Sequence, residues 1–138
     1  MREILFRGKL TDDSKWGYGC LLDKIYGAVP AIMSQQSVDD AFNLEFEYDH
    51  VQEKTVGQYT GMKDKNGKRI FEGDIVTGLF SFGMEIKAVV VFQDGAFGLQ
   101  WIRGGAEQFS AFTSICNVEF EVIGNIHDNP ELLGAADV

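Results

Sequence analysis

The stretch that decides the fold runs from Val56 to Val76 and reads VGQYTGMKDKNGKRIFEGDIV. Two runs rich in β-forming residues, 56–60 and 69–71, flank a polar turn built on Asn66 and Gly67, and positive φ is expected at both turn residues. Gly73 and Asp74 then lead into a third run at residues 75–79. The stretch therefore predicts a hairpin and a following strand. It contains no recognisable catalytic pattern.

Two further blocks lie towards the ends of the chain. Phe6-Arg7 stands near the N-terminus, and residues 122–132 read VIGNIHDNPEL. Together with the central stretch, they resemble the YopX family of bacteriophage and prophage proteins. The resemblance implies a mostly β protein with an SH3-like barrel in its C-terminal part and a phage-related origin. It brings no catalytic residues, because that family has no assigned activity.

The rest of the sequence also predicts short strands at regular intervals, which favours a mostly β fold with a short-stranded antiparallel barrel. Near residues 52–54 an acid-only block ends and the central stretch begins. We therefore expect an N-terminal β subdomain at residues 1–54 and a C-terminal barrel domain, SH3-like by the resemblance, at residues 55–138. Asn129 as N-cap and Pro130 at the first helical position predict a short C-terminal helix.

The alternation of apolar and polar residues indicates which face of each strand is exposed to solvent. Phe42, Leu44, Phe46 and Tyr48 alternate with polar and acidic residues, which is typical of a strand with one solvated face. The run 84–92 begins in the same way, but Val89 and Val91 make its outer face apolar as well. Asp94-Gly95 and Gly104-Gly105 predict two tight turns, and residues 109–116 fit either a strand or a helical turn.

The net charge of −9 is unevenly distributed. Residues 25–53 and residues 104–138 each contain six acidic residues and no Lys or Arg. By contrast, four basic residues crowd the predicted turn, namely Lys63, Lys65, Lys68 and Arg69. Because duplex binding needs many cations to neutralise phosphates, this balance argues against generic DNA binding.

Motifs of catalysis and metal binding are not found. Asp64, Asn66 and Gly67 echo a calcium loop, but its twelfth position would be Gly73 rather than a carboxylate, so a hairpin turn explains them better. His50 and His127 have no second ligand at metal spacing, and His127 is expected to cap the turn at residues 129–130. We therefore expect no catalytic, cofactor or metal site and a protein that is not an enzyme.

Two cysteines, Cys20 and Cys116, lie far apart without a CxxC partner. In a reducing compartment, each is expected to be a small buried thiol. A pairing of either cysteine with a distant histidine stays open, because the sequence does not constrain it. No apolar run is long enough to span a membrane and no signal peptide is apparent, so we expect a location in the cytoplasm of a bacterial host cell.

The predicted function is that of an interaction or assembly module. The alternative is a nucleic-acid-associated accessory protein that uses the basic turn at residues 63–69, with exposed aromatic residues stacking single strands. The acidic total favours a protein partner, as yet unknown. The apolar outer face at Val89 and Val91 predicts self-association as a homo-oligomer.

Overall fold

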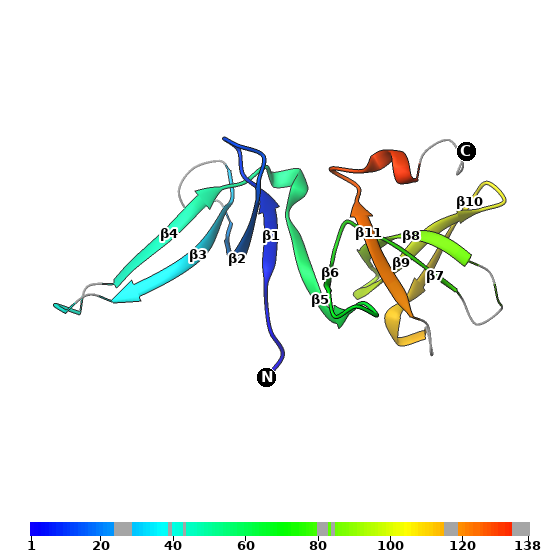
Figure 1. Ribbon diagram of the computed structural model, residues 1–138, viewed down its shortest axis with the longest axis horizontal. Helices are drawn as coiled ribbons and strands as arrows, with labels where there is room; N and C mark the ends of the chain where they lie inside the picture. Colours follow the sequence, from blue (N-terminus) through cyan, green and yellow to red (C-terminus); the bar gives the residue numbers. More distant parts are fainter. Residues whose placement is uncertain are drawn as a thin grey trace. The chain divides into compact units, whose positions relative to one another are not determined.

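The computed structural model describes residues 1–133 apart from 24–28, 39, 43, 80–82, 84 and 115–118, and for residues 35–38, 44, 46 and 114 it describes the main chain only. The chain forms short antiparallel strands (Figure 1). It divides into two compact units, Met1–Tyr59 and Thr60–Val138, whereas the sequence suggested a boundary after residue 54. In the described part of the chain, no helix has the length and apolar character needed to cross a bilayer.

The first unit is a sheet of neighbouring hairpins. Its elements are β1 (Phe6–Lys9), β2 (Trp16–Leu22), β3 (Ala31–Val38), β4 (Leu44–His50), the 3-10 turn η1 (Glu53–Thr55) and the start of β5 (Gly57–Lys63). The strand order is β4-β3-β2-β1-β5, and β5 continues into the second unit, where β6 (Arg69–Phe71) follows it in the same sheet. We call residues 56–76 the signature and its turn at residues 64–68 the signature turn. The predicted pairing of the two runs that flank this turn is therefore confirmed.

The end of β4 is tied back to the end of β1. Leu10 and Val51 form an isolated antiparallel bridge, and the N–H of Thr11 donates to the carbonyl of His50 over 3.0 Å. Val51 is completely buried, and a Cβ added at Gly8 would lie 2.8 Å from the Val51 Cβ. Glycine at position 8 therefore leaves the space that Val51 fills.

The second unit is a five-stranded sheet with the order β10-β9-β8-β7-β11. Its strands are β7 (Asp74–Leu79), β8 (Glu85–Gln93), β9 (Ala96–Arg103), β10 (Ala106–Ala111) and β11 (Phe120–Asn125). Two 3-10 turns accompany them, η2 (Phe112–Ser114) and η3 (Pro130–Leu132). The ambiguous run at 109–116 is thus the end of β10 followed by η2, and its last residues lie outside the described ones.

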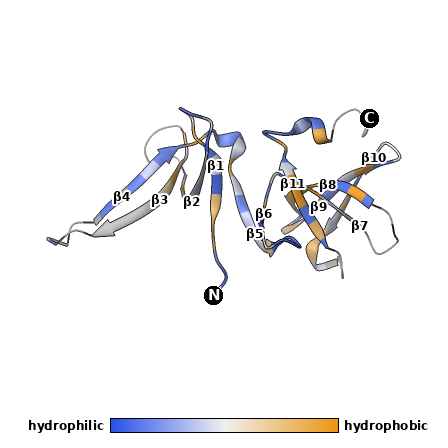
Figure 2. Cartoon of the chain, in the orientation of Figure 1, coloured by the Kyte–Doolittle hydropathy of each residue, from blue (hydrophilic) through white to orange (hydrophobic). Residues whose placement is uncertain are grey.

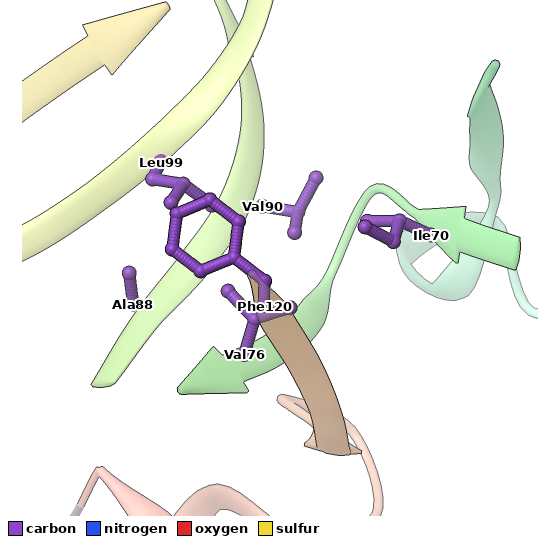
Figure 3. Packing of buried hydrophobic residues seen from close by; sticks show 6 residues of the cluster. All are labelled: Ile70, Val76, Ala88, Val90, Leu99 and Phe120. Carbon is purple, nitrogen blue, oxygen red and sulfur yellow. The ribbon is translucent and has the colours of Figure 1, made fainter. Parts of the chain in front are cut away.

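The core of this unit lies on one face of the sheet. The ring of Phe120 points towards Leu99 (Figure 3). The complete buried cluster is Ile70, Val76, Ala88, Val90, Leu99 and Phe120. A Cβ at Gly78, the partner of Phe120 across the β7–β11 ladder, would lie 2.7 Å from the Phe120 ring. Hydrophobic and hydrophilic residues alternate along strands of this sheet (Figure 2), which is typical of a sheet that buries one face.

Two tight turns connect the strands of this sheet. Asp94 and Gly95 have φ values of 52° and 82°, and Gly104 and Gly105 have φ values of 61° and 79°. Positive φ at both central residues is the type I′ geometry that matches the twist of paired strands. Both turns were predicted from sequence and are confirmed.

Three expectations about this unit are wrong. The described strands form two antiparallel sheets and do not close into a barrel, so the predicted SH3-like barrel is not found. The C-terminal helix is a single three-residue 3-10 turn, and the side chain of Asn129 makes no helix cap. In the signature turn only Gly67 has a positive φ, at 81°, whereas Asn66 was expected to share it.

Candidate interaction surfaces

The carboxylate of Asp64 organises the signature turn. One of its oxygens accepts hydrogen bonds from the N–H groups of Asn66 and Lys68, over 2.8 and 2.9 Å. The other accepts from the N–H of Val122 on β11, over 3.0 Å. The N–H of Lys65 also donates to the carbonyl of Phe120, over 2.9 Å. The turn between β5 and β6 is thereby attached to the outer edge of β11.

Asp64 is only 8% exposed, and the hydrogen bonds to its carboxylate decide its charge. Burial is the largest single influence and acts to raise the pKa of this carboxyl. The bonds from Val122, Lys68 and Asn66, with the nearby Lys68 ammonium, outweigh it and hold the pKa below its ordinary value. Asp64 is therefore an ionised structural residue. Its oxygens face main-chain N–H groups, which explains why the calcium-loop echo does not describe this turn.

The aspartate at the other end of the signature also serves the main chain. Asp74 is 2% exposed and accepts a hydrogen bond from the N–H of Phe71 over 2.8 Å. This bond closes the turn that contains Gly73, whose φ is 87°. The signature thus uses both of its buried carboxylates to build turns.

The four basic residues of the predicted contact surface, Lys63, Lys65, Lys68 and Arg69, are all exposed around this turn. Lys65 lies 3.7 Å from a carboxylate oxygen of Glu121, and both side chains are a little over two-fifths exposed. An open groove of about 530 Å³ adjoins them, lined by Lys65, Thr77, Gly78, Leu79, Glu85, Glu119 and Glu121. Three glutamates in this groove offset the positive charge of the turn.

Val89 and Val91, the other two predicted contact residues, lie on the face of β8 opposite the core residues Ala88 and Val90. Both are half-buried. Val89 pairs with the fully buried Ile75 and lines a small hollow of about 150 Å³ together with Lys87, Gln100, Trp101, Ile102 and Leu133. The chain just beyond η3 therefore shields part of this apolar face.

The end of β11 shows why that segment folds back. The side-chain oxygen of Asn125 accepts from the N–H groups of His127 and Asp128, both over 2.9 Å. The side-chain oxygen of Asn129 in turn accepts from the N–H of Asn125 over 3.2 Å. These bonds hold the turn at residues 125–128 through Asn125 and Asn129, and the capping of residues 129–130 by His127 stays a prediction.

The candidate catalytic groups are the two cysteines and two histidines of the chain. Cys20 is exposed, so the expectation of a buried thiol is wrong at this position, and Cys116 lies outside the described residues. The ring of His50 contacts the ring of Tyr48 edge-on, with centroids 5.9 Å apart. Among the described residues, no three His, Cys, Asp or Glu side chains gather closely enough to hold a metal ion.

Two features were not recognised from the sequence. Arg7 is 5% exposed, and its guanidinium lies over the ring of Trp16, 4.7 Å from the centroid. Its position in the Phe6-Arg7 block is the signal that could have indicated this. Phe42 is 89% exposed and has a φ of 62°, a conformation that bulky residues rarely adopt. The sequence placed Phe42 at the start of the alternating run, whereas β4 begins only at Leu44.

These observations define the class of the protein: two antiparallel β units joined by a signature whose buried carboxylates bind the main chain. The model of the family described as YopX protein matches residues 5–134, so the chain belongs to this family.

Two solved structures are similar to the chain. Protein EF1440 from Enterococcus faecalis has 26% sequence identity and a TM-score of 0.64, with coverage of 96% of this chain and 99% of that chain. Protein YopX from Bacillus subtilis has 17% identity and a TM-score of 0.52, with coverage of 96% and 97%, and this likeness shows the fold alone. A comparison with curated proteins found no match.

Proposed function

We propose that this protein is a non-enzymatic interaction or assembly module of phage or prophage origin that works in the cytoplasm of a bacterial host. The observation that carries the proposal is that the signature has a structural role. Its buried carboxylates, Asp64 and Asp74, are bonded to main-chain N–H groups. A motif that serves the fold in this way leaves the task of the molecule to its surfaces.

The charge around the signature turn favours a protein partner over nucleic acid. Glu121 pairs with Lys65, and Glu85 and Glu119 line the same groove. A strand of phosphates laid along this turn would meet those carboxylates as well as the cations, and repulsion would reduce the gain from released counterions. The nucleic-acid role remains the second candidate, because Lys63, Lys68 and Arg69 are exposed beside it.

Self-association through the outer face of β8 is part of the proposal. Val89 and Val91 are only half-buried there, and Ile102 on the neighbouring strand is 41% exposed. Apolar surface of this kind supports a contact between copies, because burying it removes it from water. Lys87 at the margin of the same face would remain solvated.

Sedimentation equilibrium over a range of protein concentrations tests this role. We expect a mass above that of the 15.4 kDa monomer, and Val91→Glu should lower it by placing a charge in the contact. Thr113→Glu is the matched control, because this exposed residue lies on η2, outside that face. A monomer at every concentration would remove self-association from the proposal.

A labelled single-stranded oligonucleotide at low salt tests the second candidate. Retention that is lost when Lys63, Lys65, Lys68 and Arg69 are reversed in charge would establish nucleic-acid binding at the turn. Absence of retention would leave the protein-contact role in place.

A further inference from the structure

The β4 edge is the terminal strand of the sheet in the first unit. In the strand order, β3 is its only neighbouring strand (Figure 1). Within the described chain, the contact on its other side is the short tie at its end, where Leu10 and Thr11 meet Val51 and His50. Residues 44–49 therefore form the border of the sheet.

The hydrogen bonds at this tie reveal which main-chain groups of β4 point outward. The N–H of Val51 donates to Pro30 on the β3 side over 3.0 Å, whereas the carbonyl of His50 accepts from Thr11 on the opposite side. Because this direction alternates along β4, and the extra residue of the bulge between Met33 and Gln35 lies on β3, the main chain at positions 44 and 46 points away from β3. These positions can template an added strand.

The side chains of the intervening residues give this edge its charge. Glu45, Glu47 and Asp49 alternate along one face of β4, and all three are exposed. The surrounding segment, residues 25–53, contains no Lys or Arg. Figure 2 shows the hydrophilic colour along β4. An added strand would place its own side chains about 5 Å from this acidic row.

We propose that the β4 edge binds an extended, basic segment of a partner protein, which adds to the sheet as a further strand with Lys or Arg at alternate positions. This inference deepens the proposed interaction role and rests on it. Opposite charges directly across a ladder stabilise the pairing, whereas like charges oppose it. The same rule disfavours pairing of β4 with the β4 of a second copy, since both strands would present the acidic row.

The hairpin tip before β4 adds an apolar contact. The ring of Phe42 is 89% exposed, and its backbone is held in the left-handed region. Exposed aromatic surface next to an edge strand is available to aliphatic residues of the occupant. The edge therefore selects a segment in which basic and apolar residues alternate.

A short labelled peptide with alternating Lys and Val is the probe, and its fluorescence anisotropy with the full chain measures binding. The comparison peptide replaces each Val by Pro, which keeps the charge but prevents pairing as a strand. We expect the Lys-Val peptide to bind, and to shift the amide NMR signals of residues 44–49. Equal binding of both peptides, or shifts elsewhere only, would reduce the effect to general charge attraction and overturn the proposal.

Paired variants locate the site. Glu45→Lys with Glu47→Lys should weaken peptide binding by about tenfold or more. Glu107→Lys with Glu131→Lys makes the same change of net charge at two exposed positions of the second unit and should alter binding much less. Equal losses in both double variants would contradict a site at β4.

The outcome is independent of the self-association test. All four charged positions are exposed, so circular dichroism of each variant checks that the fold is retained. If the chain is a monomer but the peptide binds at β4, self-association fails and the edge proposal stands. Self-association that disappears in the Glu45, Glu47 double variant would instead assign this edge to a second copy.

Discussion

The carboxylate of Asp64 accepts a hydrogen bond from the N–H of Val122, a residue 58 positions further along the chain. The same carboxylate holds the N–H groups of Asn66 and Lys68 in its own turn. One side chain therefore shapes a local turn and covers the edge of β11, which is an end strand of the five-stranded sheet.

Asp64→Ala should destabilise the protein by about 2 to 4 kcal/mol, because it removes a charged acceptor from three N–H groups. The midpoint of urea unfolding measures this loss. Glu121→Gln is the control, since it removes a half-exposed ion pair and should change the free energy of unfolding by less than about 1 kcal/mol. Similar effects of the two changes would contradict the structural role of Asp64.

The stability that Asp64 provides should depend on pH. Its pKa is lowered in the folded state, so the unfolded chain takes up a proton more readily and the contribution is complete above the ordinary value of 3.8. It is lost as pH falls below that value. The difference in unfolding free energy between the natural protein and Asp64→Asn should therefore be constant near neutrality and shrink in acid. A difference that grows in acid would be inconsistent with the lowered pKa.

Gly67→Val should destabilise the protein by about 1 to 3 kcal/mol through backbone strain. A Cβ at Gly67 would meet no atom within 4 Å, so steric overlap contributes nothing. Because asparagine tolerates positive φ, Gly67→Asn should have a much smaller effect in the same unfolding experiment. If Val and Asn are equally harmful, the cause is something other than the φ of 81°.

Gly124→Ala tests the opposite cause at the end of β11. Gly124 has no positive φ, but a Cβ there would lie 2.6 Å from the side-chain oxygen of Asn129. Overpacking of this kind should cost about 1 to 3 kcal/mol and loosen the turn that follows. Thermal unfolding of Gly124→Ala, of Asn129→Ala and of the double variant checks this, since relief of the clash makes the two changes less than additive. Strict additivity would exclude the clash.

The sequence predicted best the features that local chemistry determines. The hairpin of β5 and β6, the two-residue turns at 94–95 and 104–105, and the alternation of β8 depend on neighbouring residues, and the structure contains them. These local patterns could not predict hydrogen-bond partners that are distant in the sequence. The bond from Val122 makes Asp64 an organiser of the turn, whereas the sequence drew attention to Asn66.

For the same reason, the sequence could not predict whether the strands close into a barrel. Evenly spaced short strands fit a barrel as well as two open sheets, and the difference depends on which strand edges meet. The tie between Leu10 and Val51 shows how such an edge contact arises between distant segments. Of the candidate surfaces, the sequence indicated the charge of β4, but its border position required the strand order.

The attachment of the signature turn to β11 has a consequence for how the chain folds. Strands β7, β8, β9 and β10 pair in order with their sequence neighbours, so they can assemble through contacts that close short loops. The turn at 64–68 is adjacent in sequence to this meander, yet two of its anchors come from Phe120 and Val122. Closing that long loop has the larger entropic cost. We therefore expect the most recognisable local stretch of the chain to be completed late in folding, when the last strand arrives.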